Sequence, residues 1–186
     1  MLIKRAEPED IGKISLLHKK AFDKTHFTAN FSLKLLNYYF NKLIKTISFN
    51  YVFYEGNNLE GYVIGGIDPN IAVNSFIKEH LLGIIKTLLM NPRFIPEKIN
   101  ELFRGTLQSE SEKVPTIYII AANPDFKGGA GKKLLEEFEK EIKAKNYKKY
   151  TLSVRKENFK AINFYKKNNF KLESESRESY KFYKLL

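Results

Sequence analysis

The sequence predicts an α+β fold in which a mixed sheet carries helices on its faces. Short apolar runs of strand length alternate with longer segments whose apolar residues recur at helical spacing, and polar turns separate the two kinds of segment. The chain has 186 residues, which is enough to bury one full hydrophobic core. We therefore expect a single domain over residues 1–186.

The N-terminal part is predicted to form two helices and three strands. Pro8, Glu9 and Asp10 are typical of a helix start, and Ser32 can cap a second helix because its hydroxyl accepts a backbone N–H. A polar turn at 55–58 separates two apolar runs, as in a β-hairpin. The three strands are predicted at 2–6, 49–54 and 60–67.

Residues 68–115 are predicted to be a helical insertion between the third and fourth strands. A helical pattern covers 75–90, Asn91 and Pro92 end it, and a second short helix follows over 96–107 before a polar linker. The first helix has an apolar stripe from Leu81 to Leu89, which is typical of a helix that covers a core. Binding to a membrane surface or a partner is the alternative.

The C-terminal part is predicted to alternate strands and helices. A strand at 116–122 leads through a glycine-rich turn to a helix that ends near Asn146, since Asn tolerates the left-handed conformation. The remaining predicted elements are a strand at 150–154, a helix at 158–167 and two closing strands at 170–175 and 179–185.

Composition excludes several kinds of site. The chain has no cysteine, so it forms no disulfide and no thiolate metal site, and its three scattered histidines predict no metal site either. The N-terminus lacks the apolar region of a signal peptide, and the longest apolar stretch, 81–90, is too short to span a bilayer. We expect a cytoplasmic protein without a transmembrane segment.

The net charge of +11 raises the question of a polyanionic partner. Only five of the 32 basic residues are arginine, and the lysines are spread along the chain. Reading of bases and bidentate binding of phosphate favour arginine and a clustered basic patch. We therefore predict a solvated lysine surface and no nucleic-acid partner.

The turn NPDFKGGAGKKLL (123–135) connects a predicted strand to a predicted helix. A nucleotide P-loop would need a glycine at Phe126 and a hydroxyl at Lys133, and a dinucleotide fingerprint would need a third glycine at Leu134, so spacing excludes both. An anion bound at the helix N-terminus remains, with charge added by Lys127 and Lys132.

A second motif, LSVRKENFKAINFYKKNNF (152–170), follows the next predicted strand. It places Asn158, Ala161, Phe164, Tyr165 and Phe170 at a spacing that, together with the glycine turn, resembles the GNAT superfamily of acyl-CoA-dependent N-acetyltransferases. Residues 3–10 also look like the first strand and helix of that family, so the resemblance covers nearly the whole chain. It implies a GNAT-like, mostly antiparallel sheet.

The resemblance implies a function: transfer of an acetyl group from acetyl-CoA, a co-substrate, to a primary amine of a small molecule or peptide by direct attack in a ternary complex. It places Asn158 near the cofactor and makes Tyr165 the acid that protonates the leaving thiolate, a role that suits a side chain protonated at neutral pH. The resemblance is compatible with a homodimer. The other implied cofactor contacts are Ile120, Ala121 and Ala122 along the pantetheine arm and Lys127, Gly128, Gly129, Ala130, Gly131 and Lys132 at the pyrophosphate.

The general base is not evident from the motifs. Ser153 stands where N-terminal acetylases of ribosomal proteins carry a glutamate, and the remaining candidates are Glu55, Asp68, His26 or a chain of waters. His18 and His80 are predicted to be structural or solvated. The missing base, and a glycine loop one residue shorter than the family's, leave a non-catalytic GNAT-like domain that binds CoA or a partner as the alternative.

Overall fold

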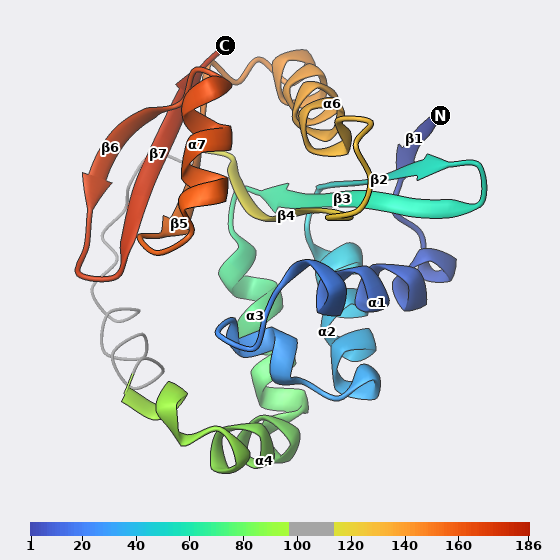
Figure 1. Ribbon diagram of the computed structural model, residues 1–186, viewed down its shortest axis with the longest axis vertical. Coiled ribbons are helices and arrows are strands. Elements are labelled where there is room, and N and C mark those ends of the chain that lie inside the picture. The colour runs from blue at the N-terminus through green and yellow to red at the C-terminus, as the bar shows by residue number, and fades with distance from the viewer. Residues whose placement is uncertain (97–113) are drawn as a thin grey trace.

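The computed structural model describes residues 1–96 and 114–186, and these form a seven-stranded sheet (Figure 1). The strand order is β1-β2-β3-β4-β5-β7-β6, and all neighbours are antiparallel except β4 and β5. The predicted mixed, mostly antiparallel sheet is confirmed. The strands are β1 (Leu2–Arg5), β2 (Phe49–Glu55), β3 (Asn58–Gly66), β4 (Thr116–Ala122), β5 (Lys149–Arg155), β6 (Lys171–Glu175) and β7 (Ser179–Leu185).

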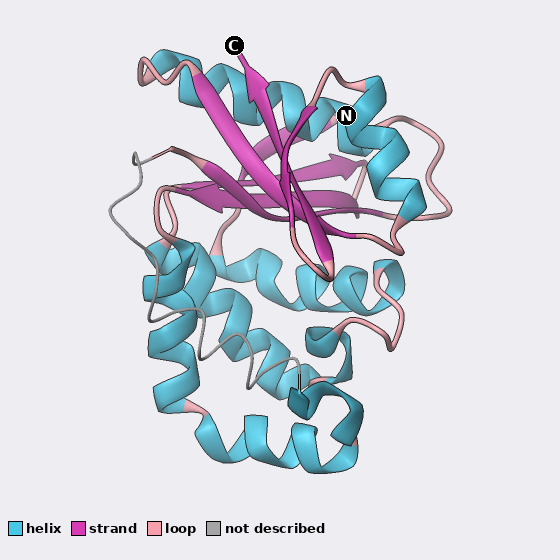
Figure 2. Cartoon of the chain, turned by 90° about the vertical axis from the view of Figure 1, so that its left-hand side faces the viewer, coloured by secondary structure: helices cyan, strands magenta, loops and turns pink. Residues whose placement is uncertain are grey.

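Helices cover both faces of this sheet (Figure 2). On one face gather α1 (Ile11–Ala21), α2 (Leu33–Thr46), α3 (Pro69–Glu79) and α4 (Leu81–Met90). On the other lie α6 (Ala130–Ala144) and α7 (Phe159–Lys167). Short 3₁₀ helices occupy Pro8–Asp10, Phe27–Asn30 and Pro92–Phe94.

Each face has its own apolar core. Leu36 and Phe40 of α2 are fully buried in the core of the α1–α4 face, and Leu134 and Phe138 of α6 are fully buried in the core of the α6–α7 face. The central strands contribute to both cores, because alternate side chains of a strand point to opposite faces. No helix in the described part of the chain is long and apolar enough to cross a membrane.

Local signals set several helix ends as the sequence predicts. The Ser32 hydroxyl accepts the N–H of Leu35 at 3.2 Å, and α2 begins at the next residue, Leu33. Asn146 has a φ of 63° directly after the last turn of α6, as expected of a residue that ends a helix in the left-handed conformation.

The helix predicted at 75–90 is wrong in its start and in its continuity. It begins at Pro69, because the Asp68 carboxylate accepts the N–H of Asn70 at 3.0 Å and caps the helix. It then breaks into α3 and α4 at His80, whose ring stacks on Tyr38 with centroids 4.6 Å apart. The predicted end before Asn91 is confirmed. Most of the predicted helix at 96–107 and of the linker after it lies outside the described residues.

Candidate active site

Strands β4 and β5 separate after a short stretch of parallel pairing. The paired residues are Thr116 with Thr151 and Ile117 with Leu152, at the beginning of β4 and in the middle of β5. Strand β4 continues to Ala122 and stays paired with β3 over its whole length. The edge of β4 that faces β5 is therefore open along its C-terminal half, and we call this opening the β4–β5 gap.

An irregularity in β4 sets which backbone groups face the gap. The register between β3 and β4 shifts so that Tyr118 is an extra residue, a β-bulge. Beyond it, the N–H of Asn123 donates to the Glu60 carbonyl at 2.8 Å. Because hydrogen-bonded and non-hydrogen-bonded pairs alternate in an antiparallel ladder, the backbone groups of Ile120 and Ala122 point into the gap. Those of Ala121 point to β3, where the residue pairs with Tyr62.

The glycine turn ends at the start of α6, beside the open end of the gap. Gly129 has a φ of 73°, a conformation that favours glycine, and its carbonyl accepts the N–H groups of Lys132 and Lys133 at 3.1 and 3.2 Å. The preceding N–H groups, of Ala130 and Gly131, belong to the first turn and have no intrahelical partner. A helix start with two such N–H groups is of the kind that can bind an anion.

The side chains of the turn are arranged around Phe126. Its ring packs against Phe53, with centroids 5.7 Å apart, and a Cβ on Gly128 would lie 2.2 Å from it. The exposed basic side chains are Lys127, which donates to the Pro124 carbonyl at 3.2 Å, and Lys132 on the first turn of α6. The shorter loop thus anchors its aromatic residue and leaves the lysines in solvent.

The two residues of the second motif have different surroundings. Asn158 is exposed, and its side-chain oxygen accepts the N–H of Ala161 at 3.1 Å, which caps α7. Tyr165 is buried against the rings of Phe170 and Phe182. Its hydroxyl has no hydrogen-bond partner among residues 1–96 and 114–186, and burial raises its pKa far above the ordinary value. Tyr165 therefore keeps its proton at neutral pH.

A sequence model of the acetyltransferase (GNAT) family matches residues 14–170, which include β4, the glycine turn and α7. The chain belongs to the GNAT acetyltransferase family. The resemblance stated from the two motifs is thus confirmed. A search of the curated proteins finds no match.

Solved structures share the GNAT fold with this chain. The PaiA N-acetyltransferase from Thermoplasma acidophilum, in complex with coenzyme A, superposes with a TM-score of 0.65 at 16% identity, covering 100% of this chain and 98% of its own. Ard1 from Thermoplasma volcanium gives 0.62 at 15%, covering 100% and 97%. Naa20 from Chaetomium thermophilum, in complex with a bisubstrate analogue, gives 0.60 at 18%, covering 100% and 87%.

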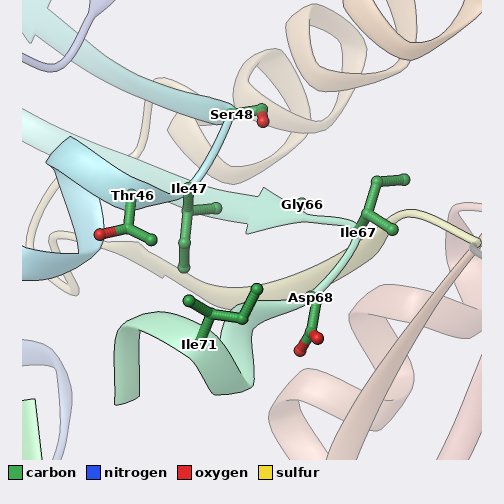
Figure 3. Close-up of a pocket in the computed structure, with 7 residues that line it drawn as sticks. All are labelled: Thr46, Ile47, Ser48, Gly66, Ile67, Asp68 and Ile71. Carbon is green, nitrogen blue, oxygen red and sulfur yellow. The ribbon is translucent and has the colours of Figure 1, made fainter. Parts of the chain in front are cut away.

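The three candidate bases occupy different parts of the GNAT fold. Asp68 lies beyond the closed end of the gap, in a shallow pocket formed where β2, β3 and α3 meet (Figure 3). Glu55 ends β2 at the hairpin, 3.7 Å from the N-terminal amino group of Met1. His26 lies in the α1–α2 loop, where the neighbouring Thr25 carbonyl accepts a hydrogen bond from Arg155 at the end of β5. Of the three candidate bases, only His26 therefore lies near the open end of the β4–β5 gap.

The sequence did not reveal a polar cluster on the α1–α4 face, beneath β3. His18 is fully buried and hydrogen-bonded through both ring nitrogens, to Tyr62 at 2.6 Å and to Thr28 at 2.8 Å. His18 lies in the core, as expected of a structural histidine. Its two hydrogen-bond partners come from β3 and from the α1–α2 loop. Burial lowers the pKa of His18 to about 3. Among the described residues, no group of three acidic or histidine side chains could hold a metal ion.

Proposed function

We propose that this GNAT protein is an acetyl-CoA-dependent N-acetyltransferase that acts on a primary amine of a small molecule or peptide. The observation that carries the proposal is the β4–β5 gap, whose open strand edge leads to a glycine-capped helix start. The PaiA structure, which contains coenzyme A on the same fold, supports the choice of cofactor.

The cofactor would be held mainly by backbone groups. Ile120 and Ala122 offer N–H and C=O groups to the amides of the pantetheine arm, as a neighbouring strand would. The N–H groups of Ala130 and Gly131 face the pyrophosphate, and the positive end of the helix dipole favours its charge. Lys127 and Lys132 add positive charge next to this site from exposed side chains.

Acetyl-CoA supplies an activated thioester, so the chain's residues have mainly to orient the amine and handle protons. The amine attacks the thioester carbonyl, its C–N bond forms as the C–S bond breaks, and the thiolate leaves. Tyr165 would donate its proton to that sulfur, since it is protonated at neutral pH and its hydroxyl has no hydrogen-bond partner among the described residues. A backbone N–H beside the Tyr118 bulge stabilises the oxygen charge that develops.

Ser153, exposed on β5, stands where N-terminal acetylases of ribosomal proteins carry a glutamate, so this position supplies no carboxylate as a general base. The amine proton would therefore pass to water, since His26 Nδ1 is already hydrogen-bonded to the Thr28 hydroxyl at 2.9 Å. The same observation favours a second candidate, a GNAT domain that binds CoA without catalysis.

Two measurements test the proposal. Calorimetry with acetyl-CoA should show binding to one site per chain, and no heat at millimolar ligand would contradict the proposal. Thiol release should then be followed over a panel of primary alkylamines, polyamines and short peptides with a free α-amino group. Binding of acetyl-CoA with no thiol release from any amine would favour the non-catalytic candidate.

A further inference from the structure

A buried chain of hydrogen bonds joins strand β3 to the α1–α2 loop. The Tyr62 hydroxyl lies 2.6 Å from His18 Nδ1, His18 Nε2 lies 2.8 Å from Thr28 Oγ1, and Thr28 Oγ1 lies 2.9 Å from His26 Nδ1. Tyr62 and His18 are both fully buried. The chain thus runs from the interior of the α1–α4 core to the half-buried 3₁₀ segment Phe27–Asn30.

The direction of proton donation along this chain is fixed by its buried end. Among the described residues, His18 Nδ1 is the one acceptor for the Tyr62 hydroxyl, so Tyr62 donates to it. A neutral His18 must then donate from Nε2 to Thr28, and Thr28 must donate to His26 Nδ1. His26 is consequently held in the tautomer that carries its proton on Nε2.

This chain orients groups and does not conduct protons. Passing a proton inward would place a positive charge on His18. The His18 ring is packed against the rings of Phe22 and Phe40, and this buried apolar environment disfavours the charged form. At the inner end, the Tyr62 proton has no second acceptor among the described residues. A fixed arrangement of donors is therefore the stable state.

The chain lies at the mouth of the β4–β5 gap. Tyr62 pairs with Ala121, next to the backbone groups that face the gap. The end of α1 and the loop after it contact both strand ends: Arg155 of β5 donates to the Thr25 carbonyl at 3.2 Å, and Lys20 of α1 pairs with Asp125 after β4 at 2.7 Å. The loop thus borders the gap on the face opposite to α6 and α7.

The geometry points to His18 as a positioning residue for amine binding, which acts through Thr28 to hold the α1–α2 loop (residues 22–32) and the His26 ring at the mouth of the gap. This inference rests on the proposed function. The α1–α4 face is suited to binding the amine because the opposite face is filled by α6, α7 and the proposed cofactor contacts.

Thr28→Val tests the inference with little change in shape. It removes the hydroxyl that links His18 to His26, so the KM for the panel amine with the highest wild-type turnover should rise about three- to tenfold. The KM for acetyl-CoA should stay within about twofold, and Thr28→Ser should restore the amine KM. In parallel, ¹⁵N NMR of the histidine rings should show His26 as the Nε2–H tautomer in the wild type and a mixture in Thr28→Val.

A second pair of variants separates positioning from folding. His18→Phe leaves the Tyr62 hydroxyl buried without a partner and should destabilise the fold, whereas the double variant His18→Phe/Tyr62→Phe removes both polar groups and should recover stability. The double variant should still show the raised amine KM. An amine KM equal to that of the wild type, in an active Thr28→Val or double variant, would overturn the inference alone. Failure of the wild type to bind acetyl-CoA would overturn it together with the proposed function.

Discussion

The two faces of the sheet use different means to build their half of the site. On the α6–α7 face, the groups proposed to bind the cofactor are backbone atoms at small residues: the open edge of β4 and the helix start after Gly129. On the α1–α4 face, the loop at the gap is tied to the core by side chains that meet from distant parts of the sequence, such as His18 and Tyr62.

This difference explains why one half can be read from sequence and the other cannot. A backbone site needs a particular order of small residues, so it leaves a contiguous motif. A side-chain network needs residues that converge in space, and any helix or strand can supply them without a local pattern. The proposed cofactor half therefore leaves a signal in the sequence, whereas the proposed amine half depends on tertiary contacts of this chain.

The largest effect is expected on the α6–α7 face, from Tyr165→Phe. Removing the proposed acid should lower kcat at least about 100-fold. Stability should not fall, because the variant loses no hydrogen bond to the described residues. Thiol release at saturating acetyl-CoA and urea unfolding measure the two quantities.

Tyr150→Phe is the matched control on the same face. Its hydroxyl donates to Glu139 at 2.6 Å, so this variant should lose about 1–3 kcal/mol of stability with little change in kcat. Equal kcat values for Tyr165→Phe and the wild type would refute the acid role.

A smaller effect is expected from Gly129→Ala, which tests the backbone part of the same face. The φ of 73° costs a residue with a Cβ roughly 1–2 kcal/mol, and relief of that strain would move the N–H groups of the helix start. Calorimetry should show acetyl-CoA affinity lowered about tenfold.

Gly12→Ala, on the open surface of α1, is the control: it should raise stability by roughly 0.5–1 kcal/mol and leave affinity unchanged. Similar affinities in both variants would remove the glycine turn from the cofactor site.

The α1–α4 face should show a dependence of stability on pH that comes from His18. The folded-state pKa of His18 is about 3, against 6.5 for the free side chain. Between these values the unfolded chain binds a proton that the folded chain does not, so the free energy of unfolding should fall on acidification by about 1.4 kcal/mol per pH unit from this group. Urea unfolding between pH 7 and pH 4.5 measures it. The double variant His18→Phe/Tyr62→Phe should have a flatter profile, and parallel profiles would show that His18 becomes protonated in the folded state.

Much of the chain's secondary structure follows from local sequence. The strand at 116–122 has the predicted bounds, and Ser32 and Asn146 act at helix ends as their side chains predict. The break at His80 was not predicted; there the ring of His80 stacks on Tyr38 of another helix, a contact that the local sequence does not reveal. Secondary-structure propensity reflects only residues that are close along the chain.

The sequence by itself determined the family, through the order of small residues in the glycine turn and the spacing of Asn158 and Tyr165. Only the tertiary structure decided where β4 and β5 part, which backbone groups the bulge at Tyr118 turns into the gap, and which residues stand opposite the proposed cofactor contacts. It also decided that Asn158 caps a helix while His18 joins β3 to a loop. The physical reason is that backbone motifs are local, whereas strand separation and buried hydrogen-bond chains depend on packing between distant segments.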